Sequence, residues 1–172
     1  MKETIQVFDY AGQITKALPR GILLNTQGEK FNSMVIGWGH LGVIWGQPSF
    51  TVYVRQSRFT KPLLDAAREF TLSVPLGDGA ALSPEVFRVF GSRSGRELDK
   101  ADYVSLEPAR SIRTPGIREY PLTLECRVLY QQDQLHSAMS QAVLDRYYAG
   151  GGDPGDFHTA YIGQIVDAYV IR

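Results

Sequence analysis

The chain has 172 residues, of which 44% are hydrophobic, and its formal net charge is zero. This length is typical of one domain with its own core, so we expect a single domain over residues 1–172. The neutral charge favours neither nucleic acid nor an anionic membrane surface as a partner, and we expect neither. Residues 1–6 lack the apolar run of a signal peptide, and no stretch approaches about 18 apolar residues. Together with a lone Cys126, which has no internal disulfide partner, these features indicate a cytoplasmic protein.

The N-terminal part of the chain predicts strands joined by turns. Residues 1–17 show little periodicity and predict an opening strand or arm followed by a turn. Residues 20–26 form an apolar run of strand length, and the polar turn 27–30 leads into a second strand over 31–38. A third strand, rich in β-branched and aromatic residues, is expected over 49–55.

A segment rich in glycine and tryptophan separates the second and third strands. Gly37, Gly39 and Gly42 indicate a place where some group approaches the backbone closely. Trp38 and Trp45 flank this segment, which we expect to be a loop. The two rings are candidates for stacking on a ligand, and ordinary packing is the alternative.

Two helices are expected in the middle of the chain. Residues 60–69 predict a helix capped by its first residue, a threonine, and residues 70–74 return as a strand. Ser83 begins a second helix with an apolar stripe. Ser94 and Glu97 have the spacing of a helix capping box.

The C-terminal part returns to strands. Residues 122–130 alternate cleanly as a strand, 131–134 predict a polar turn, and 157–171 predict a long strand bent at Gly163. Strands that follow one another in this way favour an antiparallel sheet closing into a barrel.

A short helix and a loop are expected between these two strands. Residues 140–148 predict the helix, with Val143, Leu144 and Tyr147 pointing inward, and the glycine-rich segment 150–156 predicts the loop.

A polar segment after the third strand is the sharpest local indication of a ligand site. Its pattern R-x-S-R-x-T supplies Arg55, Ser57, Arg58 and Thr60 at the start of the expected helix. Guanidinium groups pair with phosphate oxygens, and hydroxyl groups and helix-start N–H groups complete an anion site. On spacing alone, a helix cap beside two solvated arginines remains the alternative.

Other candidate sites are weaker. The strand 32–38 is able to present its backbone to a flat ring, with Ser33 and Gly37 leaving room, but the pattern fits a core strand as well. The loop 91–100 lacks Walker spacing and does not follow a strand, so it is expected to be a turn that donates polar contacts. Cys126 lies among alternating apolar residues and is expected in the core.

The histidines and the remaining catalytic motifs narrow the chemistry. His40, His136 and His158 are scattered along the chain, so no metal site is predicted. His158, at the start of the last strand, is the functional candidate, and a structural role is its alternative. No hydrolase arrangement and no dinucleotide fingerprint stands out.

Six segments, taken in order, resemble the flavin reductase-like family and are close to flavoredoxins. These segments are N-S-M-V-I-G-W (32–38), I-W-G-Q-P (44–48), V-R-Q-S-R-F-T (54–60), F-T-L-S-V-P (70–75), G-S-R-S-G-R-E-L-D-K (91–100) and H-T-A-Y-I-G-Q-I (158–165). The resemblance covers roughly residues 16–171. It implies a mainly β fold with short helices, an antiparallel split β-barrel that binds FMN, with FAD less expected, at a homodimer interface.

The resemblance also implies the site. It places the flavin ring on the backbone of 32–38 and the phosphate on the R-x-S-R-x-T segment and the loop 94–100. The implied cofactor-binding residues are Asn32, Ser33, Met34, Val35, Ile36, Gly37, Trp38, Arg55, Ser57, Arg58, Phe59, Thr60, Ser94, Gly95 and Lys100. His158 is similar in position to a histidine near flavin and nicotinamide and is the implied catalytic residue. Two positions depart from the family pattern: Gly37 replaces a frequent small polar residue, and Gln164 replaces a glutamate.

Three functions remain open at this point. The leading hypothesis is an FMN-binding oxidoreductase that moves electrons from NAD(P)H or a protein donor, through flavin N5, to an acceptor. The second is a non-catalytic flavin electron carrier that is reduced by a protein partner. The third is a relative that has lost flavin and serves as a binding module. For the first two, the expected partner is a small molecule or a redox protein.

Overall fold

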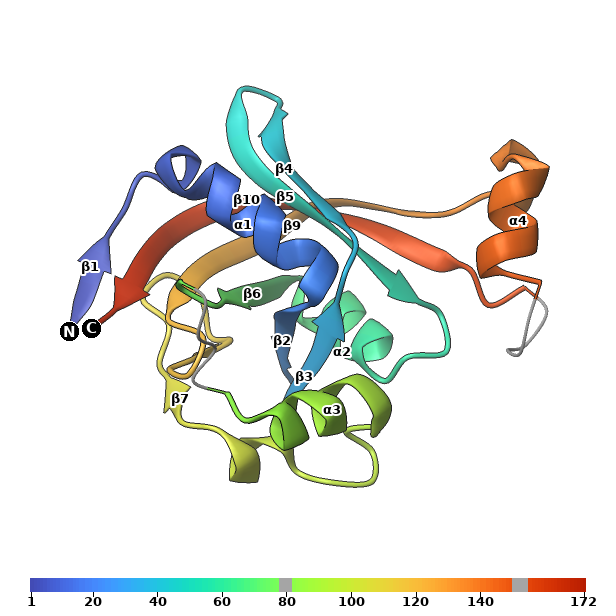
Figure 1. Ribbon diagram of the computed structural model, residues 1–172. Coiled ribbons are helices and arrows are strands. Elements are labelled where there is room, and N and C mark those ends of the chain that lie inside the picture. Colours follow the sequence, from blue (N-terminus) through green and yellow to red (C-terminus); the bar gives the residue numbers. More distant parts are fainter. Residues whose placement is uncertain (78–81, 150–154) are drawn as a thin grey trace.

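The computed structural model describes residues 1–77, 82–149 and 155–172. Its main sheet has eight strands, and two further short strands pair with each other (Figure 1). The main-sheet strands are β1 (Lys2–Thr4), β2 (Ile22–Gln27), β3 (Phe31–Ile36), β4 (Gly39–Ile44), β5 (Gln47–Arg55), β6 (Glu69–Val74), β9 (Leu122–Asp133) and β10 (His158–Ile171). The separate pair is β7 (Leu106–Glu107) with β8 (Gly116–Ile117).

The helices in the described residues are short. The α-helices are α1 (Ala11–Ala17), α2 (Thr60–Ala67), α3 (Pro84–Ser92) and α4 (Gln141–Tyr147). The 3-10 turns are η1 (Val7–Tyr10), η2 (Leu18–Arg20), η3 (Lys100–Tyr103) and η4 (His136–Ala138).

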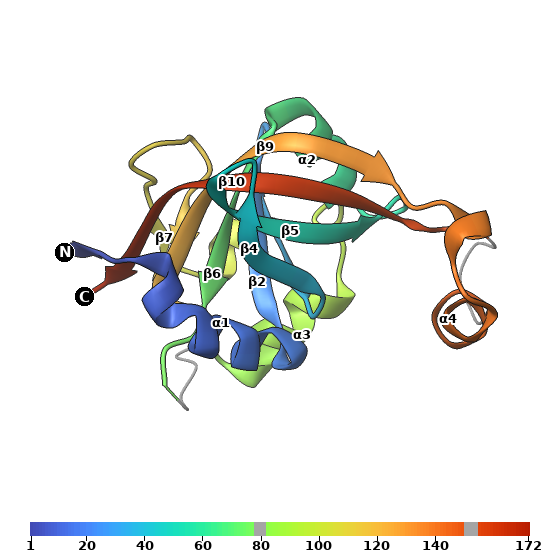
Figure 2. The same ribbon diagram turned by 90° about the horizontal axis from the view of Figure 1, so that it is seen from above.

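The order of strands explains the shape of the sheet. It runs β3-β2-β6-β9-β10-β5-β4, with β1 added to β10, and every pair is antiparallel. Only Gly37 and Trp38 separate β3 from β4, the two end strands, so the sheet must curl until its ends approach each other. The predicted antiparallel split barrel is therefore confirmed, with the split lying between β3 and the end of β5 (Figures 1 and 2).

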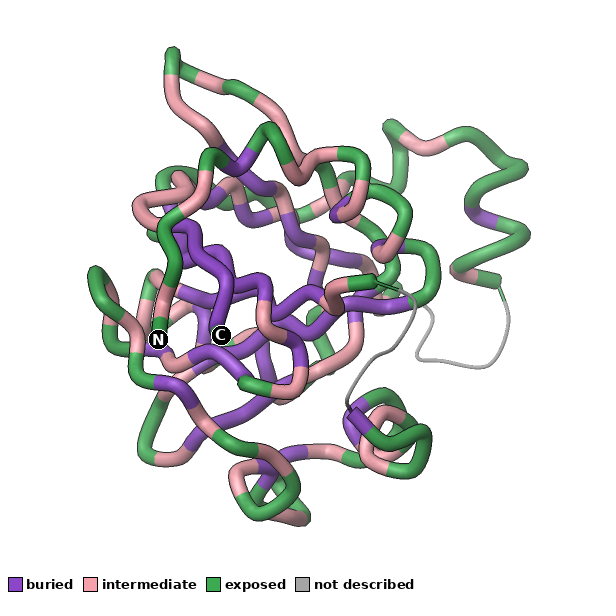
Figure 3. The backbone as a smooth tube through the Cα atoms, turned by 60° about the vertical axis from the view of Figure 1, so that its left-hand side comes forward, coloured by how far each residue is buried: buried purple, intermediate pink, exposed green. Residues whose placement is uncertain are grey.

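The sheet has an apolar cluster on each face. Ile22 and Leu24 of β2 lie in the main cluster, which Ile14 of α1 also joins, whereas Leu23 packs in a second cluster with Phe90 of α3. Successive side chains of a strand point to opposite faces, so the apolar run of β2 contributes to both clusters. Figure 3 shows the buried backbone concentrated in the middle of the molecule.

Several local predictions are confirmed. The strands on either side of the turn 27–30 pair as a hairpin. The Ser83 hydroxyl accepts the N–H of Val86 and caps α3. At Gly163 the pairing of β10 with β9 shifts register, and a side chain there would meet the Phe70 ring at 2.6 Å. Helix α2 ends two residues earlier than predicted, because Arg68 takes a left-handed φ of 57°.

The predicted glycine and tryptophan loop is wrong. Its residues form β4, a regular partner of β5, and the turn of the hairpin is at Trp45 and Gly46, with φ of 51° and 72°. A Cβ on Gly39 would lie 2.5 Å from the Phe50 ring. The close approach at Gly39 is therefore that of the neighbouring strand and its side chain.

Two further segments differ from their predictions. Residues 1–17 contain α1 after the opening strand, and a helix this short offers too little periodicity to be recognised. The predicted turn 131–134 is mostly strand, since β10 pairs with β9 as far as Asp133.

Two predicted caps do not form. The Thr60 hydroxyl accepts a hydrogen bond from the Asn32 amide (2.9 Å) and caps nothing. Ser94 begins no helix; its hydroxyl accepts the N–H of Arg96 within a turn. In both cases the hydroxyl oxygen accepts a hydrogen bond from another nearby group in place of a helix-start N–H.

Helix α4 forms as predicted, but its inward face is narrower. Leu144 is buried, whereas Val143 and Tyr147 are exposed. The helix projects from the body at the end of the β9–β10 pair (Figure 2). The predicted loop 150–156 lies mostly outside the described residues, which exclude 150–154.

Candidate functional site

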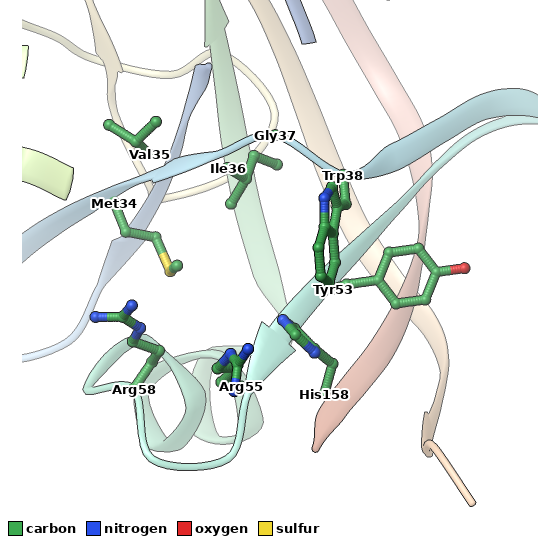
Figure 4. Close-up of a pocket in the computed structure, with 9 residues that line it drawn as sticks. All are labelled: Met34, Val35, Ile36, Gly37, Trp38, Tyr53, Arg55, Arg58 and His158. Carbon is green, nitrogen blue, oxygen red and sulfur yellow. The ribbon is translucent and has the colours of Figure 1, made fainter. Parts of the chain in front are cut away.

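The split in the barrel holds a cavity of about 210 Å³, which we call the fork cavity. Beyond Gly39, which pairs with Val52, β4 turns away toward β3. Among the described strands, the last residues of β5 therefore pair with β10 alone. The cavity fills the fork between β3 and β5 (Figure 4). Its lining residues are Met34, Val35, Ile36, Gly37, Trp38, Tyr53, Arg55, Arg58 and His158.

A second cavity of about 170 Å³ lies beside it under residues 91–100, and we call it the loop cavity. Met34, Val35 and Arg58 line both cavities, which makes them neighbours. The other lining residues are Asn32, Ser57, Phe59, Thr60, Phe90, Gly91, Arg93, Ser94, Gly95, Arg96 and Lys100.

Strand β3 faces both cavities with a free edge. It lies at the end of the sheet and pairs with β2 alone among the described strands. The carbonyl of Ser33 points away from β2, since it accepts the Lys100 ammonium at 2.6 Å. In an antiparallel pair, backbone groups two residues apart point the same way, so the N–H and C=O of Val35 also face outward. The strand therefore offers main-chain donors and acceptors to a ligand.

Aromatic groups line one side of the fork cavity. The Trp38 and His158 rings lie 4.9 Å apart, and Tyr147 meets Trp38 edge to face at 5.3 Å. His158 is buried, and burial and the positive charge of Arg55 lower its pKa to about 4. The imidazole is therefore neutral at neutral pH.

The loop cavity holds a buried cation. Lys100 is 2% exposed and donates to the carbonyls of Ser33 (2.6 Å) and Phe90 (3.2 Å). Among the described residues no carboxylate lies within 4.0 Å of its ammonium group. Burial and the nearby charge of Arg58 lower the pKa of Lys100 to about 8. Buried charges are normally paired, so this ammonium is suited to an anionic ligand.

The polar residues of the R-x-S-R-x-T segment have two different roles, bonding to the protein and facing the cavities. The Asp156 carboxylate accepts the Ser57 N–H (2.9 Å) and hydroxyl (2.6 Å). Arg55 donates to the carbonyls of Asp156 (3.2 Å) and Tyr147 (3.0 Å). The exposed Arg58 guanidinium has no hydrogen bond or ion pair with a described side chain or carbonyl and lines both cavities. Of the two arginines, Arg58 is the one left for a ligand.

The structure brings together every predicted site residue except Ser33. Its hydroxyl donates to the buried Asn25 carbonyl oxygen (2.7 Å), so its side chain lines neither cavity. The Ser33 side chain therefore does not face a ligand in either cavity, and only its carbonyl points toward Lys100. Gln164, one of the two family departures, lines neither cavity. At Gly37, the other departure, a Cβ would make only an ordinary contact, 3.6 Å from the Leu18 carbonyl.

Sequence reasoning missed several residues of the site. Tyr53 lines the fork cavity, and Arg93 and Arg96 line the loop cavity. Tyr148 and Asp156 come from the connection between β9 and β10 and reach His158 and Ser57. The arginines lie inside the predicted 91–100 segment, but nothing in the sequence links Tyr148 or Asp156 to the site.

The described residues offer neither a metal-binding cluster nor a helix suited to cross a membrane. The described residues hold no group of three or more His, Cys, Asp or Glu side chains that could bind a metal. None of the described helices is long and apolar enough to cross a membrane.

Known structures share this fold. Flavoredoxin from Methanosarcina acetivorans is 22% identical, with a TM-score of 0.67 over 88% of this chain and 68% of that one. Flavoredoxin of Desulfovibrio vulgaris (Miyazaki F) is 21% identical, with a TM-score of 0.66 over 88% and 69%. A Streptomyces globisporus NADH:FAD oxidoreductase is 18% identical, with a TM-score of 0.63 over 88% and 75%.

The family follows from a separate comparison at the level of sequence. The model of the flavin reductase like domain matches residues 15–172, which is nearly the whole chain. This span includes both cavities and all six segments that carry the resemblance. The chain therefore belongs to the flavin reductase-like domain family.

Proposed function

We propose that the protein is an FMN-binding oxidoreductase of the flavin reductase or flavoredoxin type. The observation that carries the proposal is the pairing of two adjoining cavities of different character. The fork cavity has a free strand edge and aromatic walls, and the loop cavity has a buried ammonium that pairs with no carboxylate among the described residues. FMN has the matching parts, a flat ring and a terminal phosphate.

The donor set fits this group. The outward N–H and C=O of β3 would meet the polar edge of the ring, and Arg58 and Lys100 would hold the phosphate. The polar groups of Arg55 and Ser57 already bond to Asp156 and Tyr147. The phosphate is therefore left to Arg58 and Lys100. We propose FMN in preference to FAD because FMN ends at the single phosphate that this cluster matches.

The chemistry belongs to the cofactor. Flavin held by β3, Arg58 and Lys100 would supply hydride acceptance at N5, two electrons with one proton, and transfer of those electrons to an acceptor. The protein's part is to orient the ring, to cover it from water, and to present Trp38 and the neutral His158 to a nicotinamide donor. The acceptor is proposed to be a small molecule or a redox protein.

Two sets of neighbours support two versions of this function. The Streptomyces globisporus structure is named an NADH:FAD oxidoreductase, and the proposed NAD(P)H donor for this chain follows that likeness. The flavoredoxins support the second candidate, a carrier reduced by a protein partner.

We further propose a homodimer in a reducing, cytoplasmic setting. The exposed Trp45 and Tyr130 rings, whose centroids lie 6.3 Å apart, are suited to burial against a second copy. The lone Cys126 is fully buried and unpaired, which suits a reducing compartment. Analytical ultracentrifugation tests the dimer, and a monomer that still binds FMN tightly would contradict it.

The test of the function is the visible absorption spectrum of the protein with added FMN, before and after anaerobic NADH or NADPH. Bound-flavin bands that bleach support the reductase. Bands that persist with both donors favour the carrier, which a reduced protein donor should then bleach. If no flavin stays bound after gel filtration, the cofactor assignment fails and a binding module remains.

A further inference from the structure

A chain of hydrogen bonds links His158 to Tyr148 and Gln134, two residues that do not line the fork cavity. The Nδ1 atom of His158 is 2.8 Å from the Tyr148 hydroxyl. That hydroxyl is 2.9 Å from Oε1 of Gln134. The main-chain N–H of Gln134 donates to the His158 carbonyl at 2.9 Å, which holds the two residues together from a second side. All three groups are partly or fully buried, so these bonds are not averaged with water.

The number of protons available in this chain decides which group donates in each hydrogen bond. A tyrosine hydroxyl has one proton, and a glutamine carbonyl oxygen only accepts. The Tyr148 proton therefore goes to Gln134, and the bond between Tyr148 and His158 needs its proton from Nδ1. A neutral imidazole carries one ring proton, which leaves Nε2 bare. The Gln134 amide orientation sets this result, because the flipped amide would reverse every bond in the chain.

Burial and the charges around the imidazole keep it neutral, so it carries the single ring proton that the hydrogen-bond chain requires. Burial comes first, and the positive charges of Arg55 and Arg58 act in the same direction against the weaker effect of Asp156, so the pKa of His158 falls to about 4. Near neutral pH the imidazole therefore holds a single proton.

We propose that Tyr148 and Gln134 are positioning residues that hold His158 as the Nδ1–H tautomer, with Nε2 as a hydrogen-bond acceptor in the fork cavity. Figure 4 shows the imidazole reaching into the cavity between Trp38 and Arg55. An acceptor there selects a planar ligand that carries an N–H or O–H donor, such as a primary carboxamide. This ligand class rests on the proposed function, whereas the tautomer does not.

The tautomer is tested without any cofactor. In protein labelled with ¹⁵N-histidine at pH 8, long-range ¹H–¹⁵N spectra distinguish protonated from bare ring nitrogens. His158→Asn identifies the signals of this histidine among the three in the chain. We expect a protonated Nδ1 and a bare Nε2 in the native protein. A protonated Nε2 would overturn the proposal.

Variants separate positioning from a general loss of structure. Tyr148→Phe removes the acceptor of Nδ1–H, so the ring should shift toward the Nε2–H tautomer. Tyr147→Phe is the matched control on the same helix and should leave the spectrum unchanged, since the Tyr147 hydroxyl has no bond to His158. Gln134→Glu offers only acceptors and should keep the native pattern. A native protein with Nε2–H that changes to Nδ1–H in Gln134→Glu would mean that the native amide is flipped, which overturns the proposal.

A second measurement tests the ligand class. If the protein oxidises NADH, a reduced dinucleotide with an acetyl group in place of the carboxamide should show a KM roughly 5- to 150-fold higher, with a smaller change in kcat, because Nε2 then lacks a donor. Tyr148→Phe should shrink that ratio. Equal KM values for NADH and the acetyl analogue, in a protein with the expected tautomer, overturn the ligand class and leave the tautomer standing. Absence of NADH oxidation counts against the reductase and not against the tautomer.

Discussion

The two adjoining cavities differ in how far their cationic side chains are already bonded to protein groups. At the fork cavity, Arg55 is held by the carbonyls of Tyr147 and Asp156, and its charge stands 3.9 Å from the Asp156 carboxylate. At the loop cavity, Lys100 is buried between carbonyls, and Arg58 is exposed beside it without a described partner. One segment of the chain supplies both arginines, three positions apart.

The difference shows that equivalent residues in a motif need not share a role. Arg55 and Ser57 use their polar groups to fasten the connection between β9 and β10, and so they place Tyr148 and His158 beside the fork. Arg58 remains for an anion. The fork cavity is therefore built by internal bonds, and the loop cavity is left with positive charge for a ligand to neutralise.

The largest expected effect concerns how tightly the loop cavity is built. In Gly95→Ala, the new Cβ would lie 2.2 Å from Oδ1 of the buried Asn32. We expect a loss of about 2–3 kcal/mol in the free energy of unfolding, measured by urea denaturation. Gly91→Ala is the matched control in the same cavity, since its nearest neighbour is Val35 at 3.8 Å. It should gain roughly 0.5–1 kcal/mol from helix propensity. Equal stabilities would contradict the tight packing.

The second prediction separates the two arginines. Arg58→Ala should weaken FMN binding by about 1.5–3 kcal/mol, because a charge-assisted bond to phosphate is lost. Arg55→Ala should weaken it less, since Arg55 bonds to the protein. Fluorescence titration of FMN measures both. A larger loss in Arg55→Ala would reverse the assignment.

The third prediction uses the pKa of Lys100. This pKa is lowered to about 8, so the free protein loses the Lys100 charge as the pH rises through that value. A bound phosphate favours the charged form, and binding above pH 8 must take up a proton. FMN affinity should fall by up to about fivefold between pH 8 and pH 9, because the charged fraction of free Lys100 falls by that factor. Calorimetry in two buffers of different ionisation enthalpy reports the proton uptake, which Lys100→Met should abolish.

The smallest effect is expected at Arg93. It lines the loop cavity, but its guanidinium pairs with Glu97 at 3.0 Å on the exposed surface. Arg93→Ala should change FMN affinity by no more than about 0.5 kcal/mol. A loss as large as that of Arg58→Ala would mean that the Glu97 pair opens to bind phosphate.

Much of the fold and most of the candidate site were predictable from the sequence because their signals are local. Alternation marks the strands 31–38 and 122–130, and Ser83 before Pro84 marks α3. The glycine segment misled because a glycine that accommodates a neighbouring strand looks like one that accommodates a ligand. Gly39 leaves room for the Phe50 ring of the neighbouring strand.

The sequence by itself determined the antiparallel strands and the family, and the resemblance implied the grouping of Arg58, the loop 91–100 and His158 that line the two cavities. Only the tertiary structure decided which polar groups stay available. Asp156 reaches Ser57 across 99 positions of the chain, and Lys100 reaches Ser33 across 67. Such contacts leave no local pattern, because they depend on the pairing of β10 with β5 and on the packing of η3 against β3. Chemistry at a site is set by those distant partners, since each one removes or leaves a charge or a proton for the ligand.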